Sequence, residues 1–249
     1  PTAKKIYSGA QITLIEKFYI NKLSDQSVEM KATDIGSLVL GDKKGQCTCN
    51  TCQPLEGRFG HQTTLLAQDR ILITGGLSIN GAGEREAPTY AVVLRFRDNC
   101  WHTEKVDGAK VKVRFEHTAT AITFGNRTWV IVVGGRDLDN KHVETIEVWD
   151  QDGTIAVGDT KLQAPRYGHA AIALSNQELF VVGGIGSDGK ALATGALFRL
   201  SQETGLLKLE EKPLVDPKLK EVRGRMRTQI AISTIDPRVF IFGGAVLKG

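Results

Sequence analysis

The segment Arg166-Tyr167-Gly168-His169 leads, after a short stretch, into the apolar run Leu179-Phe180-Val181-Val182, which ends at Gly183-Gly184. Self-similarity at a fixed period is the sequence signature of a repeat architecture. The same order of residue types returns in three other places: Arg58 to Gly76, Arg114 to Gly135 and, more loosely, Arg225 to Gly244. The spacings from arginine to arginine are 56, 52 and 59 residues. The chain is therefore predicted to consist of repeats of one unit.

Each repeat is long enough for four short strands. The apolar run before each glycine pair reads as a buried second strand, and a glycine pair suits a tight turn where a Cβ would clash. Two more apolar segments without proline follow each pair and read as third and fourth strands. The third strands are expected at Tyr90 to Leu94, Ile146 to Trp149 and Ala196 to Phe198, and the fourth at Trp101 to Val106, Thr154 to Val157 and Leu206 to Leu209. Four antiparallel strands per repeat form one blade of a β-propeller.

The doubled glycine after an apolar strand, followed by an aromatic residue further on, resembles the hallmark of the kelch-repeat family. The resemblance covers about residues 58 to 244, and Trp149 is the only tryptophan on an expected third strand. It implies an all-β chain with the fold of a kelch-type β-propeller.

The expected organisation is three complete blades and two half blades. The blades are placed at residues 58–107, 114–158 and 166–211, the half blades at 10–35 and 225–244, and a long cysteine-containing loop at 42–56. The two halves would pair to close a ring of about four blades by strand exchange. Kelch propellers more often have six or seven blades, so we favour a chain that is part of a larger ring, completed by a further domain or chain. In both cases open blade edges would need to be closed.

Composition narrows the class of protein. The chain has 249 residues, of which 41% are hydrophobic and 24% charged, and this is ordinary for a globular domain. The longest apolar runs, Trp129 to Val133 among them, are far shorter than the ~20 residues of a membrane helix, so no membrane partner is expected. The net charge of +4 does not by itself indicate nucleic-acid binding. Cysteine usage fits a reducing compartment, which favours a cytoplasmic or nuclear location.

One arginine recurs just before the first strand of each repeat. Equal placement in successive blades would arrange these arginines around one mouth of the channel, where the loops after the glycine pairs also arrive. Among kelch proteins that bind acidic peptides, arginines at this place often contact carboxylates, which suits a bidentate guanidinium. The alternative is a scaffold role in which each arginine binds loop carbonyls. The candidate ligand-binding residues are Arg58, Arg114, Arg166 and Arg225, with Arg136 directly after a glycine pair.

Histidines and cysteines raise the question of a metal. His61, His117 and His169 recur in register with the arginines. They would surround a channel on the order of 10 Å wide, whereas zinc–nitrogen bonds measure about 2.1 Å. We therefore expect them to form hydrogen bonds between neighbouring blades. Cys47, Cys49 and Cys52 lie close together but lack a fourth local ligand for a tetrahedral zinc site, so no metal and no cofactor is expected, with a zinc site as the alternative.

A second basic group precedes the last half blade. It consists of Lys218, Lys220, Arg223 and Arg227 besides Arg225, and Lys110 and Lys112 precede Arg114 in the same way. Together they would form a basic lip able to contact RNA, with salt-dependent affinity. Because no aromatic residues are interleaved for base stacking, solvated loop charge is the simpler interpretation.

Binding is the function expected from these features, because loops around a rigid propeller supply recognition. No nucleophile–base pair, carboxylate pair or complete metal set recurs, so catalysis in this chain is not expected. The leading hypothesis is a protein-interaction module that binds an acidic peptide or protein at an arginine-lined loop face. The residues from Pro54 to His61 and from Ile71 to Gly76 also resemble the kelch part of the tRNA wybutosine-synthesising, leucine-carboxyl-methyltransferase-like family. That resemblance implies the alternative of a propeller that positions tRNA for a methyltransferase domain outside this chain.

Overall fold

The structure of the chain is a computed structural model that describes residues 57–97, 100–107, 111–203, 206–214, 224–232 and 239–245. All the regular elements of these residues are β-strands, which confirms the expected all-β class. Within the same ranges, no helix has the length and apolar character needed to cross a membrane. The expected half blade at 10–35 and the loop at 42–56 lie outside the described residues.

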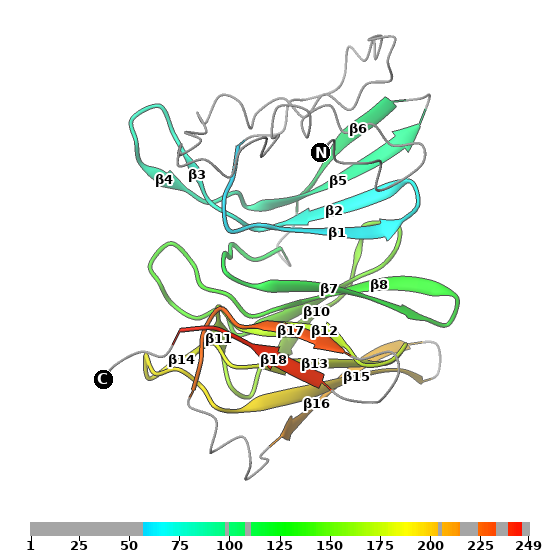
Figure 1. Cartoon of the computed structure of the whole chain (residues 1–249). Coiled ribbons are helices and arrows are strands. Elements are labelled where there is room, and N and C mark those ends of the chain that lie inside the picture. The colour runs from blue at the N-terminus through cyan, green and yellow to red at the C-terminus, as the bar shows by residue number, and fades with distance from the viewer. Residues whose placement is uncertain are drawn as a thin grey trace, which may run out of the picture.

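Three four-stranded antiparallel sheets and one strand pair form the body of the molecule (Figure 1). The first sheet contains β1 (Gln62–Ala67), β2 (Arg70–Thr74), β5 (Tyr90–Arg97) and β6 (Cys100–Asp107). The second contains β7 (Thr118–Phe124), β8 (Arg127–Val133), β9 (Thr145–Trp149) and β10 (Ile155–Lys161). The third contains β12 (Ala170–Ala173), β13 (Glu178–Val182), β15 (Gly195–Glu203) and β16 (Leu206–Leu214), and the last pair is β17 (Gln229–Ile232) with β18 (Val239–Phe242).

The four strands of each sheet follow one another in the sheet in the same order as in the chain. Two additional short pairs lie in the loops: β3 (Ser78–Ile79) with β4 (Arg85–Glu86), and β11 (Arg166–Tyr167) with β14 (Ile185–Gly186). Short hairpin turns join the first two strands of the sheets. One of them contains Gly125 and Asn126, both at positive φ, which matches the right-handed twist of the flanking strands.

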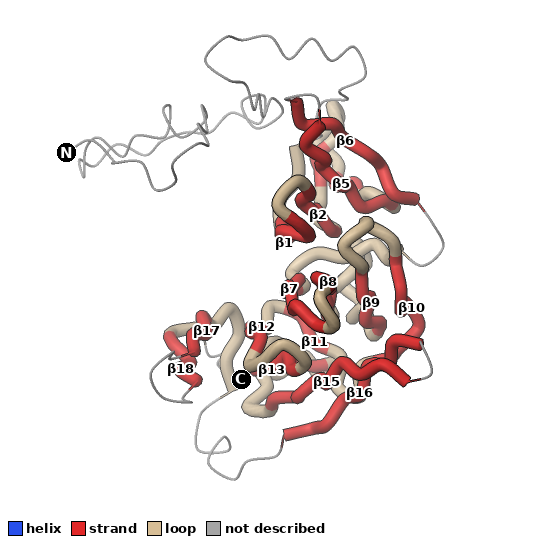
Figure 2. Tube along the Cα trace, turned by 90° about the vertical axis from the view of Figure 1, so that its right-hand side faces the viewer, coloured by secondary structure: helices blue, strands red, loops and turns tan. Residues whose placement is uncertain are grey.

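The sheets follow one another along an arc (Figure 2). The first strands β1, β7, β12 and β17 lie on its inner side, where β1 contacts β7, β7 contacts β12 and β12 contacts β17. The fourth strands β6, β10 and β16 lie on the outer side. The described residues therefore form an open arc of sheets and not a closed ring.

Both faces of β8 and of β13 are buried, because the second and third sheets each pack between two neighbours. Val130 and Val132 of β8 pack against the first sheet, while Ile131 and Val133 pack against the third. Successive strand residues point to opposite faces, so an uninterrupted apolar run is what a strand covered on both sides requires. The same alternation continues in β13, where Phe180 and Val182 face the last strand pair.

The two ends of the sheets differ in their connections (Figure 1). The turns between first and second strands lie at one end. The loops that follow the glycine pairs lie at the other end, with the β3–β4 hairpin and β14, and we call this end the loop face.

Candidate binding site on the loop face

Successive repeats are joined by the same backbone contact, which we call the glycine junction. The second glycine of each pair donates its N–H to the carbonyl oxygen of the arginine that begins the next repeat. These bonds join Gly76 to Arg114 at 2.8 Å, Gly135 to Arg166 at 2.9 Å, and Gly184 to Arg225 at 2.8 Å. The first glycine of each pair packs on the same carbonyl, so closely that a Cβ at Gly183 would lie 2.6 Å from the Arg225 oxygen. The glycine pairs are therefore required by the approach of the next repeat.

The recurring arginines stabilise the same junctions from within each repeat. Arg58, Arg114 and Arg166 expose only 8%, 1% and 1% of their surface. In every repeat the guanidinium Nη1 donates to the carbonyl of the first glycine of its own pair. The distances are 3.2 Å from Arg58 to Gly75, 2.9 Å from Arg114 to Gly134, 3.1 Å from Arg166 to Gly183, and 2.8 Å from Arg225 to Gly243.

This burial corrects the expectation of a ligand-binding arginine ring. The interpretation is wrong for Arg58, Arg114 and Arg166, because their side chains are enclosed and bind carbonyls of the scaffold. Arg114 makes further contacts with residues of β9. It also donates to the main-chain and side-chain oxygens of Thr145 at 3.0 Å each and forms a buried ion pair with Glu147 at 2.6 Å. Burial lowers the pKa of Arg114, and the Glu147 carboxylate opposes that shift.

Two of the three recurring histidines, His117 and His169, connect neighbouring repeats, as the sequence predicted. His117 Nε2 lies 2.8 Å from the hydroxyl of Thr74 in the first sheet, and His169 Nε2 lies 2.9 Å from the hydroxyl of Thr118 in the second. Burial, together with the nearby Arg114, holds the pKa of His117 well below its usual value. Burial and the neighbouring Arg166 lower the pKa of His169 to about 3. Both imidazoles are therefore neutral at physiological pH and act as hydrogen-bonding parts of the core.

The third residue of each arginine-containing turn takes a left-handed conformation. These residues are Gly60, Glu116, Gly168 and Arg227, with φ of 67°, 55°, 62° and 53°. The last three each donate their N–H to the carbonyl of the counterpart in the preceding repeat: Glu116 to Gly60 at 3.3 Å, Gly168 to Glu116 at 2.8 Å, and Arg227 to Gly168 at 2.7 Å. A left-handed φ favours glycine, yet two of the four positions carry charged side chains. Glu116 and Arg227 therefore stand where the backbone alone would prefer glycine.

Glu116 is shared by two arginines on the loop face. Its Oε1 accepts a hydrogen bond from Arg227 Nη2 at 2.7 Å, and its Oε2 lies 2.8 Å from Arg136 Nε. The Glu116 and Arg136 side chains are partly buried, with 16% and 24% exposed, whereas Arg227 is 68% exposed. One carboxylate thus faces two guanidinium groups, so the group keeps one excess positive charge.

Arg136 is held between two aromatic rings. Its guanidinium carbon lies 4.6 Å from the ring centroid of Phe115 and 4.7 Å from that of Tyr167. Phe115 and Arg136 are paired through two main-chain hydrogen bonds of 2.9 and 3.0 Å. Arg136 Nη1 also donates to the side-chain oxygen of Asn140 at 2.9 Å. Packing between rings fixes a guanidinium plane, which is the geometry that favours carboxylate recognition.

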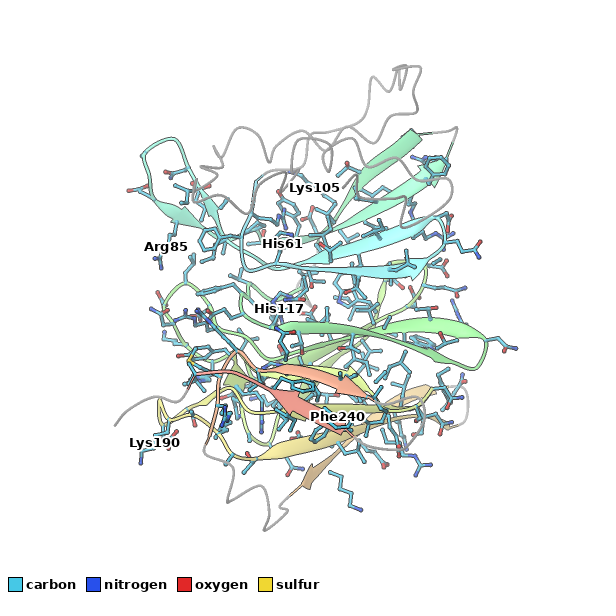
Figure 3. All side chains as sticks on the ribbon, viewed as in Figure 1. His61, Arg85, Lys105, His117, Lys190 and Phe240 are labelled. Carbon is cyan, nitrogen blue, oxygen red and sulfur yellow. The ribbon has the colours of Figure 1, made fainter. Side chains whose placement is uncertain are left out.

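We call Phe115, Glu116, Arg136, Tyr167 and Arg227 the Glu116 cluster. Arg136 and Arg227 were predicted from the sequence as candidate binding residues, whereas Phe115, Glu116 and Tyr167 were not. The signal that was available is the replacement of glycine by Glu116 and by Arg227 at the third position of the turn. Arg85 of β4 and Lys190, which follows β14, lie on the loop face as well (Figure 3).

The other candidate residues are not part of this cluster. Lys110, Lys218, Lys220 and Arg223 lie outside the described residues, as do Cys47, Cys49 and Cys52. The main-chain N–H of Lys112 donates to the Glu147 carboxylate at 3.0 Å, so this segment supports the buried ion pair of Arg114. Arg225 is partly exposed beside Gly243.

Comparisons with known proteins give the fold but no family. No family model matches the sequence, and no curated protein matches it. Among solved structures, a chain described as "Cryo-EM structure of RAG in complex with one melted RSS and one unmelted RSS" has a TM-score of 0.57 and 16% identity, covering 74% of this chain and 58% of that chain. A chain described as "Structure of YjhT" has a TM-score of 0.55 and 14% identity, covering 78% of this chain and 60% of that chain. The present chain thus spans under two thirds of each, and at these identities the likeness concerns the fold alone.

Proposed function

We propose that this chain is a kelch-type β-propeller module that binds an acidic segment of another protein at the Glu116 cluster. The propeller part of the proposal is supported by three consecutive meander sheets with their first strands on the inside of an arc. Propeller blades are four-stranded sheets arranged radially in this way. The doubled glycine at every junction supports the kelch type, and the longer neighbours favour a ring with more blades than this chain supplies.

The observation that carries the binding proposal is the sharing of one carboxylate between Arg136 and Arg227. A guanidinium has five N–H donors, and each of these arginines uses only some of them within the described residues. A carboxylate from a partner would supply the second negative charge. Hydrogen bonds between ionised groups are the stronger ones, and a guanidinium is suited to bidentate contact.

The charges on the surrounding loops indicate how long an acidic ligand the site would favour. Near the cluster the loop face carries acidic as well as basic side chains, among them Asp137, Asp139 and Lys141. Attraction is therefore local to the two arginines and does not come from a broad basic field. A short acidic segment that inserts one or two carboxylates fits this arrangement better than a long polyanion.

The test is binding of a fluorescein-labelled peptide rich in Asp and Glu, compared with its Asn/Gln counterpart. Arg136→Gln and Arg227→Ala should each weaken binding about ten- to a hundredfold, because a hydrogen bond to a charged group contributes roughly 1.5–3 kcal/mol. The matched control is Arg97→Ala, which removes an exposed arginine of β5 that is paired with Glu104 at 3.8 Å. Equal affinity of all three variants would reject the proposal.

The same titration includes a single-stranded RNA probe. If RNA binds instead of the peptide, and its affinity falls steeply with salt, the alternative of a tRNA-positioning propeller replaces this proposal.

A further inference from the structure

The last strand pair has an apolar face that differs from the corresponding faces of the other sheets. Phe240 and Phe242 of β18 are 42% and 55% exposed, and their rings stack with centroids 6.0 Å apart. The positions that stand at the same distances before a glycine pair are Ile131 and Val133 in β8 and Phe180 and Val182 in β13, all of which are buried. The opposite face of β18, with Val239 and Ile241, packs on the third sheet. The exposed face, on which Figure 3 labels Phe240, is thus the one on which the next sheet would pack.

The glycine junction at this end is empty among the described residues. A Cβ at Gly243 would meet no atom within 4 Å, although Gly183 would meet the Arg225 carbonyl at 2.6 Å. Gly243 and Gly244 nevertheless have φ of 60° and 84°, close to the 70° and 91° of Gly183 and Gly184. The backbone therefore already has the form that receives the next arginine carbonyl. We call Phe240, Phe242, Gly243 and Gly244 the open junction.

We propose that the open junction is a docking surface for one further β-repeat that begins with an Arg-aromatic-x-His turn. The arginine carbonyl of that turn accepts the Gly244 N–H, and the apolar second strand of the repeat covers Phe240 and Phe242. The three interfaces between successive sheets all combine this hydrogen bond with apolar packing, and the open junction presents the same groups in the same arrangement. We therefore infer that its occupant is a repeat of the same kind. The inference stands on sheet packing and does not depend on the peptide proposal.

Two other occupants fit the molecule less well. Residues 1–56 contain neither arginine nor histidine, so they cannot provide the turn. A second copy would have to offer the far face of its first sheet, but Ile73, Val92 and Leu94 on that face are already buried. The further repeat therefore comes from polypeptide other than this segment of 249 residues.

Hydroxyl-radical footprinting tests the proposal on two samples, the protein purified from its natural source and the 249-residue chain alone. The readout is oxidation of Phe240 and Phe242, with exposed Phe96 as the internal reference. We expect both phenylalanines to be oxidised in the chain alone and protected at least several-fold in the natural protein. Three results would overturn the proposal: equal oxidation in both samples, protection already present in the monomeric chain alone, or protection of the chain alone that appears only as it dimerises.

A variant pair gives a second readout that does not rely on labelling. In the natural protein, Phe242→Asp should lower the melting temperature clearly more than Phe96→Asp, because it places a charge in the proposed interface. In the chain alone the two variants should have similar small effects. A similar small effect of both variants in the natural protein would contradict the docking surface.

Discussion

The interior glycine junctions and the open junction share a backbone but differ in their surroundings. At Gly134 and Gly183 the next repeat fills the space above the pair, and an arginine carbonyl takes up the second glycine's N–H. At Gly243 the same turn forms, and Arg225 binds its carbonyl at 2.8 Å, without any next repeat among the described residues. The comparison shows that the glycine turn and its arginine are properties of a single repeat. The packing that requires glycine comes from the neighbouring repeat.

The largest difference in unfolding free energy is expected between two arginine variants. One removes an arginine at an interior junction, which the next repeat fills, and the other removes the arginine at the open junction. Arg114→Ala removes one partner of a buried ion pair and leaves Glu147 unpaired, which should cost about 3–5 kcal/mol of unfolding free energy. Arg225→Ala removes a partly exposed hydrogen bond and should cost about 1 kcal/mol. Urea unfolding of both variants measures the difference, and equal losses would contradict the scaffold role of the buried arginine.

The glycines provide the second comparison. Gly134→Ala would push a Cβ into the Arg166 carbonyl. Overpacking and left-handed strain together should cost about 2–4 kcal/mol. Gly243→Ala has similar strain but open space, so about 1–2 kcal/mol is expected. Thermal or urea unfolding would separate the two. If Gly243→Ala were as damaging as Gly134→Ala, the junction at Gly243 would have to be filled within this chain.

Acid should weaken the filled junctions through their histidines. The pKa of His169 falls from 6.5 in the unfolded chain to about 3 in the folded protein. As the pH falls, His169 is therefore protonated in the unfolded chain before it is protonated in the folded protein. Its contribution to the free energy of unfolding is fully present above pH 6.5 and is lost as the pH drops toward 3. The slope is at most about 1.4 kcal/mol per pH unit.

His169→Gln keeps a polar group near Thr118 and removes this titration. The stability lost between pH 7 and pH 5 should be about 2 kcal/mol smaller in the variant than in the original protein. His117 would retain its own contribution, since its pKa is lowered as well. An unchanged pH dependence would show that His169 does not titrate in this way.

The smallest effect is expected at Glu116, whose counterparts in the first and third repeats are Gly60 and Gly168. Glu116→Gly removes the ion pairs to Arg136 and Arg227 but also relieves the left-handed strain of a non-glycine residue. Because these contributions oppose each other, unfolding free energy should change by less than about 1 kcal/mol. A loss of several kcal/mol in a urea titration would indicate that Glu116 holds the fold and is not primarily part of a binding site.

Most of the fold could be predicted from the sequence, because strands such as β8 and β13 are buried on both faces and leave an uninterrupted apolar signal. The third strand expected from Ile146 to Trp149 corresponds to β9, and the fourth expected from Trp101 to Val106 corresponds to β6. The fourth strand expected from Leu206 to Leu209 extends in the structure to Leu214. The sequence did not indicate this extension, because the added residues include charged side chains and lack an apolar pattern.

The candidate site was less predictable. A recurring arginine has the same sequence pattern whether it lines a surface or binds carbonyls inside a repeat, so the burial of Arg114 and Arg166 needed the structure. The Glu116 cluster depends on contacts between residues as far apart as 116 and 227, which no local pattern contains. The sequence does show glutamate at position 116 where two other repeats have glycine. Only the left-handed φ of 55° in the structure shows that the backbone at this position favours glycine.

Amide hydrogen exchange of the second glycine in each pair is the most direct test of the central claim that the repeats share one junction and that the last junction is open. In the 249-residue chain, the amides of Gly76, Gly135 and Gly184 should be strongly protected, because each donates to an arginine carbonyl. The Gly244 amide has no such acceptor among the described residues and should exchange at close to the rate of an unstructured peptide. Protection of Gly244 equal to that of the other three would contradict the account.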